Sequence, residues 1–197
     1  MCRLLESIKV QEGRCYNLSY HERRMHRAQQ ELLGRITIAR LSDQIVVPAF
    51  AKQGTYKCRV LYRETIEQVE FIPYQYRTIR TLKRVYCDTI EYNHKYEDRR
   101  ELNRLFAQRG DCDDVLIIKN GLVTDTSYAN VIFYDGQRWV TPAHPLLRGT
   151  QRQYLLDRGI VKEAPLREKD LDNFQQVQII NAFHKAEPFS DVTLFIE

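Results

Sequence analysis

The chain has 197 residues and a mass of 23.5 kDa, with 43% hydrophobic and 28% charged residues. These values are typical of a globular protein with one domain or two small ones, and they exclude collagen-like, coiled-coil and wholly disordered chains. The longest apolar runs, such as Ile45–Phe50, are far shorter than the roughly 20 residues of a membrane-spanning helix, and no signal peptide is visible. We therefore expect a cytoplasmic protein without a membrane segment.

The net charge of +4 is mildly basic, and basic residues alternate with acidic ones along most of the chain. A nucleic-acid binder more often concentrates its charge on one face, so this pattern favours a solvated surface. Arginine outnumbers lysine, and its guanidinium suits carboxylates and phosphates, which points to a small anionic ligand. The five cysteines are widely spaced and the histidines form no ligand motif, so we expect neither a metal site nor disulfides.

In the first half of the chain, strands surround one helix. Ser19 is a plausible N-cap for a helix from Tyr20 to Leu33, which Gly34 would end. Residues 41–51 fit either a helix or a strand, because Pro48 prevents a long helix. Residues 74–80 have no clear period and could link two domains, which we place at 1–76 and 77–197. The β-branched and aromatic content predicts strands at Arg3–Val10, Tyr56–Tyr62, Gln68–Pro73 and Thr81–Cys87, with Cys15–Leu18 short and extended.

The second half predicts a helix followed by an antiparallel meander. The helix ends at Gly110, and the pairs Asn120-Gly121 and Asp135-Gly136 are typical of tight hairpin turns. A further helix is expected from Thr150 to Gly159. The strands are expected at Val115–Lys119, Leu122–Thr124, Val131–Tyr134, Trp139–Thr141, Val177–Asn181 and Val192–Ile196. The pattern as a whole indicates an α+β fold.

Four local features could carry chemistry, although each also has an ordinary structural explanation. Lys95 precedes a helix, where the dipole favours a neutral amine, but it also fits a surface lysine. Asp125 and Asn130 follow a hairpin strand and could either cap a turn or face a buried cationic nitrogen. The run LLRGTQRQYLL begins a helix whose backbone N–H groups could bind an anion. His21 and Arg24 share one helix face, as in many exposed amphipathic helices.

Together these features resemble the class IV aminotransferases, which are pyridoxal 5'-phosphate (PLP) enzymes of fold type IV. The resemblance extends from LLESIKV to INAFHKAEPF. Glu6-Ser7-Ile8 is similar to the family's "ETI" run, and His21 to Arg24 matches its H-x-x-R motif. Two later signatures of the family are also matched. The first is matched by Gly121, Val123, Asp125 and Asn130, and the second by Thr141, Pro142, Leu147, Gly149 and Arg152.

The resemblance implies a role for each matched residue. Lys95 would bond to PLP as a Schiff base and then move protons as general base and acid. Asp125 would keep the pyridine nitrogen protonated, so that the ring acts as an electron sink. Arg24 and the helix start at Gly149, Thr150 and Gln151 would hold the phosphate. Ser127, Tyr128, Asn130, Asn181 and Ala182 complete the expected cofactor contacts.

The chain also departs from the family pattern. The signature acid is usually Glu and is Asp125 here, and Gln151 replaces a usual Thr. Tyr128 stands where a small residue is common. The strand and turn that precede the "ETI" run in the family are absent, so we expect a D-amino acid aminotransferase-like two-domain fold shortened at the N-terminus. The larger C-terminal domain is expected to carry Lys95, and the family implies a homodimer.

Three functions remain open at this level. The Ile180–Phe183 run and the TDTSYAN stretch resemble 4-amino-4-deoxychorismate lyases, which release pyruvate to form 4-aminobenzoate in folate biosynthesis. An aminotransferase of branched-chain or D-amino acids would use the same cofactor residues. A non-catalytic protein that binds PLP or another anion is the third reading. A small anionic amino compound would need cations, for which Arg63, Arg77 and Arg80 are candidates.

Overall fold

The computed structural model describes residues 2–38, 40–184 and 195–196. It divides into two compact units, the first formed by Met1–Tyr76 with His94–Asp98 and the second by Arg77–Asn93 with Arg99–Glu197. The main division coincides with the boundary between Tyr76 and Arg77 expected from the sequence. Among the described residues, no helix is both long and apolar enough to cross a membrane.

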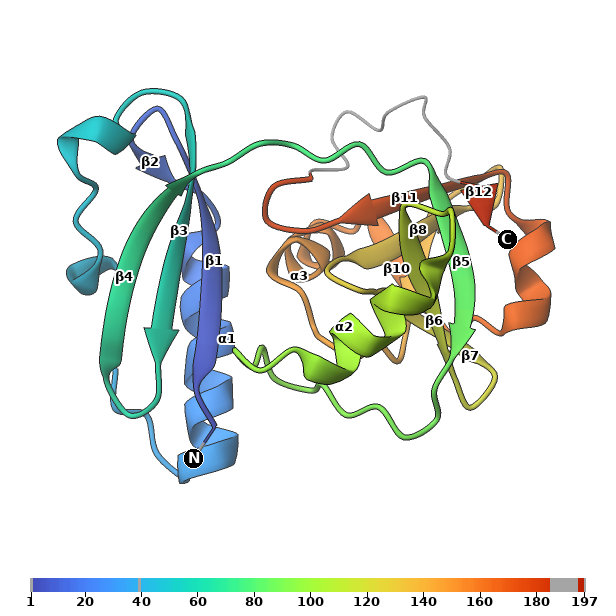
Figure 1. The fold of residues 1–197 in the computed structure, drawn as a ribbon, viewed down its shortest axis with the longest axis horizontal. Helices are drawn as coiled ribbons and strands as arrows, with labels where there is room; N and C mark the ends of the chain where they lie inside the picture. The colour runs from blue at the N-terminus through green and yellow to red at the C-terminus, as the bar shows by residue number, and fades with distance from the viewer. Residues whose placement is uncertain (1, 39, 185–194, 197) are drawn as a thin grey trace. The chain divides into compact units, whose positions relative to one another are not determined.

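The first unit is an antiparallel sheet of four strands with one long helix, α1, packed against β1 (Figure 1). The strand order is β2-β1-β3-β4, so the first strand lies inside the sheet. The elements are β1 (Leu4–Gln11), β2 (Arg14–Cys15), α1 (Leu18–Leu33), β3 (Thr55–Tyr62) and β4 (Ile66–Pro73).

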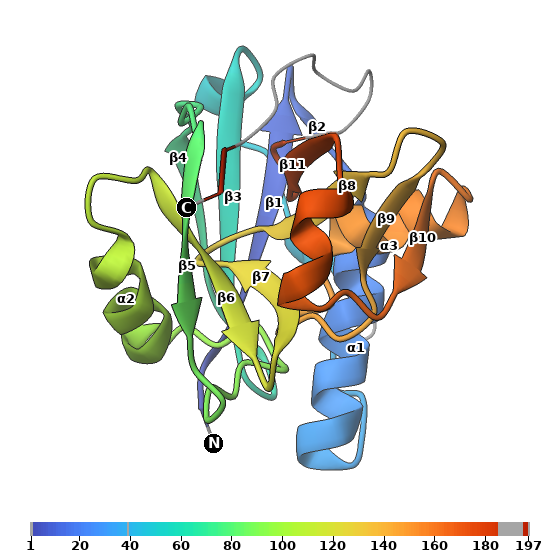
Figure 2. The ribbon, with the colours of Figure 1, turned by 90° about the vertical axis from the view of Figure 1, so that its right-hand side faces the viewer.

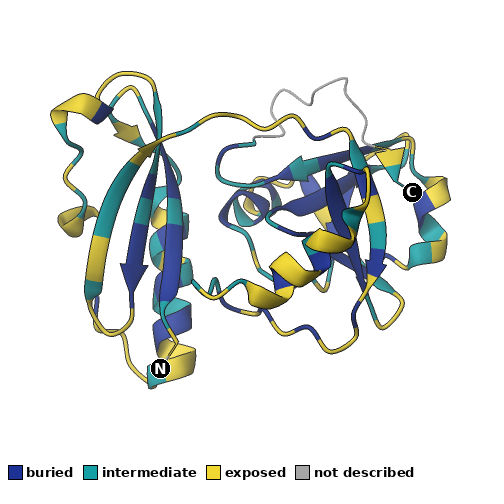
Figure 3. Cartoon of the chain, viewed as in Figure 1, coloured by how far each residue is buried: buried dark blue, intermediate teal, exposed yellow. Residues whose placement is uncertain are grey.

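Alternation along β1 decides which side chains form the core of the first unit. Leu4, Ile8 and Val10 point to the same side and pack with Met25 and Ala28 of α1. Since β1 and β3 are mostly buried, they are the darkest strands of this sheet in Figure 3. The alternation therefore defines the face of the sheet that α1 covers, and Glu6 lies on this face with Leu4 and Ile8.

The second unit is built on a larger sheet in which β8 is central. The strand order is β10-β9-β8-β7-β6-β5-β12, and β11 pairs antiparallel with β8. The strands are β5 (Thr81–Tyr86), β6 (Asp114–Lys119), β7 (Leu122–Thr126), β8 (Asn130–Tyr134), β9 (Trp139–Pro142), β10 (Val161–Ala164), β11 (Gln176–Ile180) and β12 (Phe195–Ile196).

Two helices pack on this sheet, α2 (Arg100–Phe106) on β6 and α3 (Thr150–Asp157) beside β10 (Figure 2). The strand β8 is buried on both faces: Val131 and Phe133 join one apolar cluster, and Ile132 joins another with Leu155 of α3. The core of this unit therefore lies around β8, which begins at Asn130.

Several expected elements differ from the structure. The stretch 41–51 is neither a helix nor a strand but contains two 3₁₀ turns, Ser42–Gln44 and Ala49–Ala51. The helix α1 begins before Ser19, and its cap residue is Asn17 in the left-handed conformation. The strand β10 was not expected from the sequence. Of the predicted last strand, Val192–Ile196, residues 192–194 lie outside the described residues.

The placement of Lys95 also differs from the expectation that it belongs to the C-terminal domain. The segment His94–Asp98 is part of the first unit, because it pairs with the edge of β1. The Leu5 N–H donates to the Lys95 carbonyl at 2.9 Å, and Tyr96 forms a β-bridge with Leu4. Helix α2 begins only at Arg100, so Lys95 is not at a helix N-terminus as the sequence had suggested.

Candidate functional site

A buried ionic cluster in the first unit joins β1 to α1. His21 and Arg24 are three residues apart, so they lie on the same face of α1, and this face meets Glu6 of β1. The His21 Nδ1 lies 2.6 Å from Glu6 Oε2. Arg24 donates through Nε to Oε1 at 2.9 Å and through Nη2 to Oε2 at 2.5 Å. The H-x-x-R arginine is therefore held from the side by two bonds to one carboxylate.

The electrostatics of this cluster assign its protonation states. Burial alone would raise the pKa of Glu6, but the Arg24 charge and the His21 hydrogen bond outweigh it and lower the pKa to about 2. Burial lowers the pKa of His21, and the Arg24 and Lys95 charges lower it further, against the opposing effect of Glu6. His21 is thus neutral at pH 7 and donates its Nδ1–H to an ionised Glu6.

Lys95 belongs to the same unit as this cluster. Its backbone is fixed on the edge of β1 next to Leu5, and its side chain is half-buried. The Lys95 charge contributes to lowering the pKa of His21. The predicted lysine and the H-x-x-R motif, which are far apart in sequence, are therefore brought together by β1.

In the second unit, the predicted acid Asp125 is held where β7 passes into β8. Asp125 pairs in register with Asn130 and is only 4% exposed. Its Oδ1 accepts a hydrogen bond from Asn130 Nδ2 at 2.7 Å, and its Oδ2 accepts one from the Leu147 N–H at 2.9 Å. Burial nevertheless raises the pKa of Asp125 to about 6, so its ionised form is electrostatically costly.

The glycine of the second signature lies against the asparagine of the first. A Cβ added to Gly149 would lie 1.9 Å from Asn130 Oδ1, so only glycine fits this close approach. Asn130 in turn donates to the Leu147 carbonyl at 2.8 Å. Gly149 caps α3, and its neighbours Thr150 and Gln151 are 4% and 2% exposed. The two signatures thus form one packed group around Asp125.

The remaining residue of the second signature has a different position. Arg152 is 2% exposed, and its Nη2 donates to the Pro142 carbonyl at 2.8 Å and to Glu163 at 2.6 Å. It therefore ties α3 to the parallel strands β9 and β10. This contact is structural, and it could not be predicted from the sequence because β10 was not expected.

The other expected cofactor residues lie in two turns of the second unit. The Ser127 carbonyl accepts a hydrogen bond from Arg99 at 2.7 Å. The Tyr128 ring lies 6.3 Å from the His184 ring, which brings the β7–β8 turn beside the turn containing Asn181 and Ala182. Asn181 uses its side-chain oxygen to accept the Phe183 and His184 N–H groups. Its side chain thus orders its own turn.

The three arginines expected to bind substrate occupy separate elements. Arg63 follows β3 and pairs with Glu67 at 3.2 Å in the first unit. Arg77 and Arg80 precede β5 in the second unit, and the Arg77 guanidinium lies 6.0 Å from the centre of the Phe106 ring. Their role in substrate binding stays a prediction. Two charged residues of β1 are buried, Glu6 and Lys9. In the sequence, Glu6 stands out only as part of the "ETI"-like run, not as the partner of Arg24, and Lys9 does not stand out.

Comparison with known proteins gives the fold a context. The family model for class IV amino-transferases matches residues 97–192. The chain is 40% identical over 186 residues to an uncharacterized protein of Haemophilus influenzae, covering 93% of this chain and 99% of that one. It is 33% identical to the "putative 4-amino-4-deoxychorismate lyase" of Haemophilus somnus, whose crystal structure has a TM-score of 0.88 and covers 94% of this chain and 98% of its own.

A third similarity concerns the fold alone. The PLP-bound form of a hypothetical aminotransferase from Mycobacterium tuberculosis has a TM-score of 0.79 at 16% identity, covering 100% of this chain and 81% of that one. The expected α+β fold of the type IV PLP enzymes is confirmed by these neighbours. The chain belongs to the class IV aminotransferase family.

Proposed function

We propose that this chain is a PLP-dependent lyase that converts 4-amino-4-deoxychorismate into 4-aminobenzoate and pyruvate. The family membership supports a PLP enzyme, and the Haemophilus somnus relative supports the lyase among its members. The buried carboxylate of Asp125 is the structural observation that best supports PLP as the cofactor. Burial raises the pKa of this carboxyl group to about 6.

Asp125 fits the pyridine nitrogen of PLP. Both of its oxygens are fixed by Asn130 and Leu147, so the carboxylate has a defined direction. Among the residues that the structure describes, no cationic side chain forms an ion pair with it. A protonated ring nitrogen would add to the charge of Arg152, which lowers the pKa of Asp125 by less than burial raises it, and would stabilise the ionised carboxylate. The shorter side chain of Asp relative to Glu is thus compatible with the role.

Other residues of the chain would bind the cofactor phosphate and move the proton of the substrate. In the first unit, Arg24, with its orientation fixed by Glu6, would supply a cation for the cofactor phosphate. In the second unit, the first N–H groups of α3 are donors suited to an anion. Lys95 would hold the cofactor, and its amine would serve as the general base and acid that takes a proton from the substrate and returns one. When bound, PLP supplies the electron sink that accepts charge from the substrate.

The test of the cofactor assignment is the attachment of PLP to the purified protein. We expect an absorbance band in the visible region after PLP is added, and borohydride reduction followed by peptide mapping should place the adduct on Lys95. Lys95→Ala should abolish the adduct, whereas Lys83→Ala, which removes an exposed lysine of β5, should not change it. An adduct on another lysine would contradict the assignment of Lys95.

The reaction itself is tested by its products. The loaded protein should release pyruvate from 4-amino-4-deoxychorismate without an added amino acceptor, in equal amount to 4-aminobenzoate. An aminotransferase acting on branched-chain or D-amino acids would instead require a 2-oxo acid acceptor. Pyruvate release only in the presence of such an acceptor, or transamination without lyase turnover, would refute the lyase.

A further inference from the structure

The sheet of the first unit has a second face, opposite to α1, that carries charged residues. Leu4 and Ile8 of β1 and Cys58 and Val60 of β3 belong to the core on the helix side. Because side chains alternate along a strand, the odd-numbered residues of these two strands point to the other side. We call this the second face. It consists of Leu5, Ser7 and Lys9 of β1 with Lys57, Arg59 and Leu61 of β3, paired in register.

Two lysines of the second face lie directly opposite each other. Lys9 pairs with Lys57 across β1 and β3, and like charges in directly opposed positions destabilise a sheet. The acidic residues nearby are engaged elsewhere, because Arg59 binds Glu70 at 2.8 Å and Glu97 at 2.9 Å. The face therefore holds an excess of positive charge at Lys9 and Lys57.

The ammonium of Lys9 lies between two tyrosine rings. Its Nζ is 5.6 Å from the centre of the Tyr16 ring and 5.6 Å from that of Tyr76, both within the range of cation–π contacts. Lys9 is only 6% exposed. Within the described part of the chain, its side chain forms no hydrogen bond or ion pair with an acidic group. A buried ammonium without a counter-anion is unfavourable, so an anion at this position would stabilise the protein.

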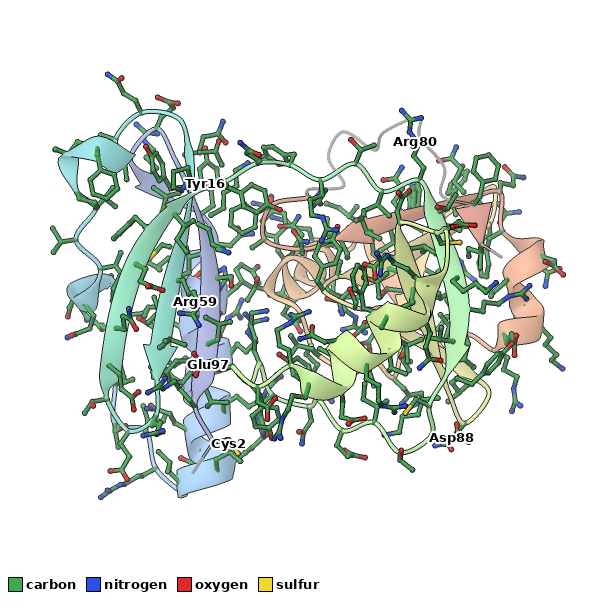
Figure 4. All side chains as sticks on the ribbon, viewed as in Figure 1. Cys2, Tyr16, Arg59, Arg80, Asp88 and Glu97 are labelled. Atoms are coloured by element: carbon green, nitrogen blue, oxygen red, sulfur yellow. The ribbon has the colours of Figure 1, made fainter. Side chains whose placement is uncertain are left out.

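The second face also runs past the segment that carries Lys95. That segment is bonded to β1 at Leu5, and Glu97 reaches Arg59 across the face. Figure 4 shows Glu97, Arg59 and Tyr16 in succession along the sheet. Leu5 and Lys9 are four residues apart, which corresponds to about 13 Å along an extended strand. Lys95 and Lys9 are thus attached to the same strand, with Lys9 further along β1 than the point at which the Lys95 segment is bonded.

We propose that Lys9, with Lys57 beside it, binds a carboxylate of the substrate that is remote from the reacting amino group. This assignment rests on the proposed PLP-dependent function, and it defines the substrate class as an amino compound with an additional carboxylate. The two tyrosines hold the ammonium in place, and Lys57 adds a second positive charge opposite it. Lys9 thus selects dianionic over monoanionic ligands.

The experiment compares two unreactive probes on the PLP-loaded protein by calorimetric titration: benzoate, with one carboxylate, and isophthalate, with two. We expect the unmodified protein to bind isophthalate at least tenfold more tightly than benzoate. Lys9→Met should remove this preference by weakening isophthalate alone, whereas Lys9→Arg, which keeps the charge, should retain it within about threefold. Lys57→Met should reduce the preference for isophthalate over benzoate by a few-fold. Lys162→Met removes an exposed lysine of β10 and should leave it unchanged.

The outcomes separate this assignment from the function on which it rests. PLP loading is read independently from the mass increase after borohydride reduction, and we expect it to be equal in all variants. Unchanged isophthalate affinity in loaded Lys9→Met and Lys57→Met, or no preference for isophthalate in the unmodified protein, would overturn the carboxylate site alone. Failure of the unmodified protein to take up PLP would overturn the proposed function and this site with it.

Discussion

The side chain of Arg24 is oriented before any ligand arrives. Glu6 accepts hydrogen bonds from its Nε and Nη2, and His21 donates to the same carboxylate. Burying three such groups costs desolvation energy, which the ion pair and its hydrogen bonds offset only if the geometry is kept. The cluster therefore acts less as a source of stability than as a support that fixes the direction of the guanidinium.

The role of Glu6 as a positioning residue can be measured through the cofactor phosphate. Glu6→Gln keeps the shape but removes the charge that holds Arg24. We expect the affinity for PLP to fall about tenfold, equivalent to about 1.4 kcal/mol, while the affinity for pyridoxal, which lacks the phosphate, changes less than about twofold. Titration by visible absorbance measures both. Glu64→Gln, at an exposed position of the same unit, serves as the control. An equal loss for both ligands would contradict the positioning role.

The sequence indicates candidate site residues but does not indicate their partners. Arg24, Asp125 and Asn130 follow from short motifs, because motif spacing reflects local backbone geometry. The pairing of Arg24 with Glu6 joins residues 18 apart, and that of Asp125 with Leu147 joins residues 22 apart. Such contacts depend on how β1 packs on α1 and how the chain returns after β9, which one sequence does not specify.

At the scale of elements, the approach of α3 to β8 depends on one glycine. Gly149 has an ordinary φ of −68°, so its backbone conformation would accept any residue. The constraint is instead space, because the Asn130 side chain occupies the position of a Cβ. Asn130 cannot move without losing its bonds to Asp125 and to the Leu147 carbonyl.

Gly149→Ala should therefore disturb Asp125 through Asn130. We expect a loss of about 1–3 kcal/mol in the free energy of unfolding, typical of an overpacked site, and weaker PLP binding. In an Asn130→Ala background the obstructing side chain is absent, so Gly149→Ala should lower the free energy of unfolding by much less. Urea unfolding of the four proteins in this double-mutant cycle measures the coupling. Additive effects of the two substitutions would show that the contact does not constrain α3.

The sequence also predicted some elements and missed others for one physical reason. The Asn120-Gly121 hairpin was expected, and both residues have positive φ, 52° and 71°, as a type I′ turn requires. The strand β10 has only four residues and alternates poorly, so it is stable only because it pairs with β9. The return of residues 94–98 to β1 is likewise non-local. Local patterns predict local pairing, and tertiary pairing decides the rest.

At the scale of the whole molecule, Glu6 in the first unit and Asp125 in the second are buried carboxyl groups with opposite effects on stability. The pKa of Glu6 is lowered to about 2, so its ionised form stabilises the fold above the ordinary pKa near 4.5 and this stabilisation is lost as the pH falls towards 2. The pKa of Asp125 is raised to about 6, so stability is greatest below about 4 and is lost as the pH rises through 6. Each shift corresponds to about 3 kcal/mol.

The cofactor-free protein should therefore be most stable near pH 4–5, and PLP should extend this range upwards. A protonated ring nitrogen beside Asp125 would lower the pKa of this carboxyl group, so the loss of stability between about pH 4 and pH 6 should shrink on loading. The only tryptophan of the chain, Trp139, lies in the same unit and reports its urea unfolding by fluorescence. Asp125→Asn should reduce the decline without PLP and leave only the part due to Asp114, whose pKa burial also raises. Glu6→Gln should leave the whole decline intact. A decline between about pH 4 and pH 6 that is equally large with bound PLP would show that Asp125 does not face the ring nitrogen.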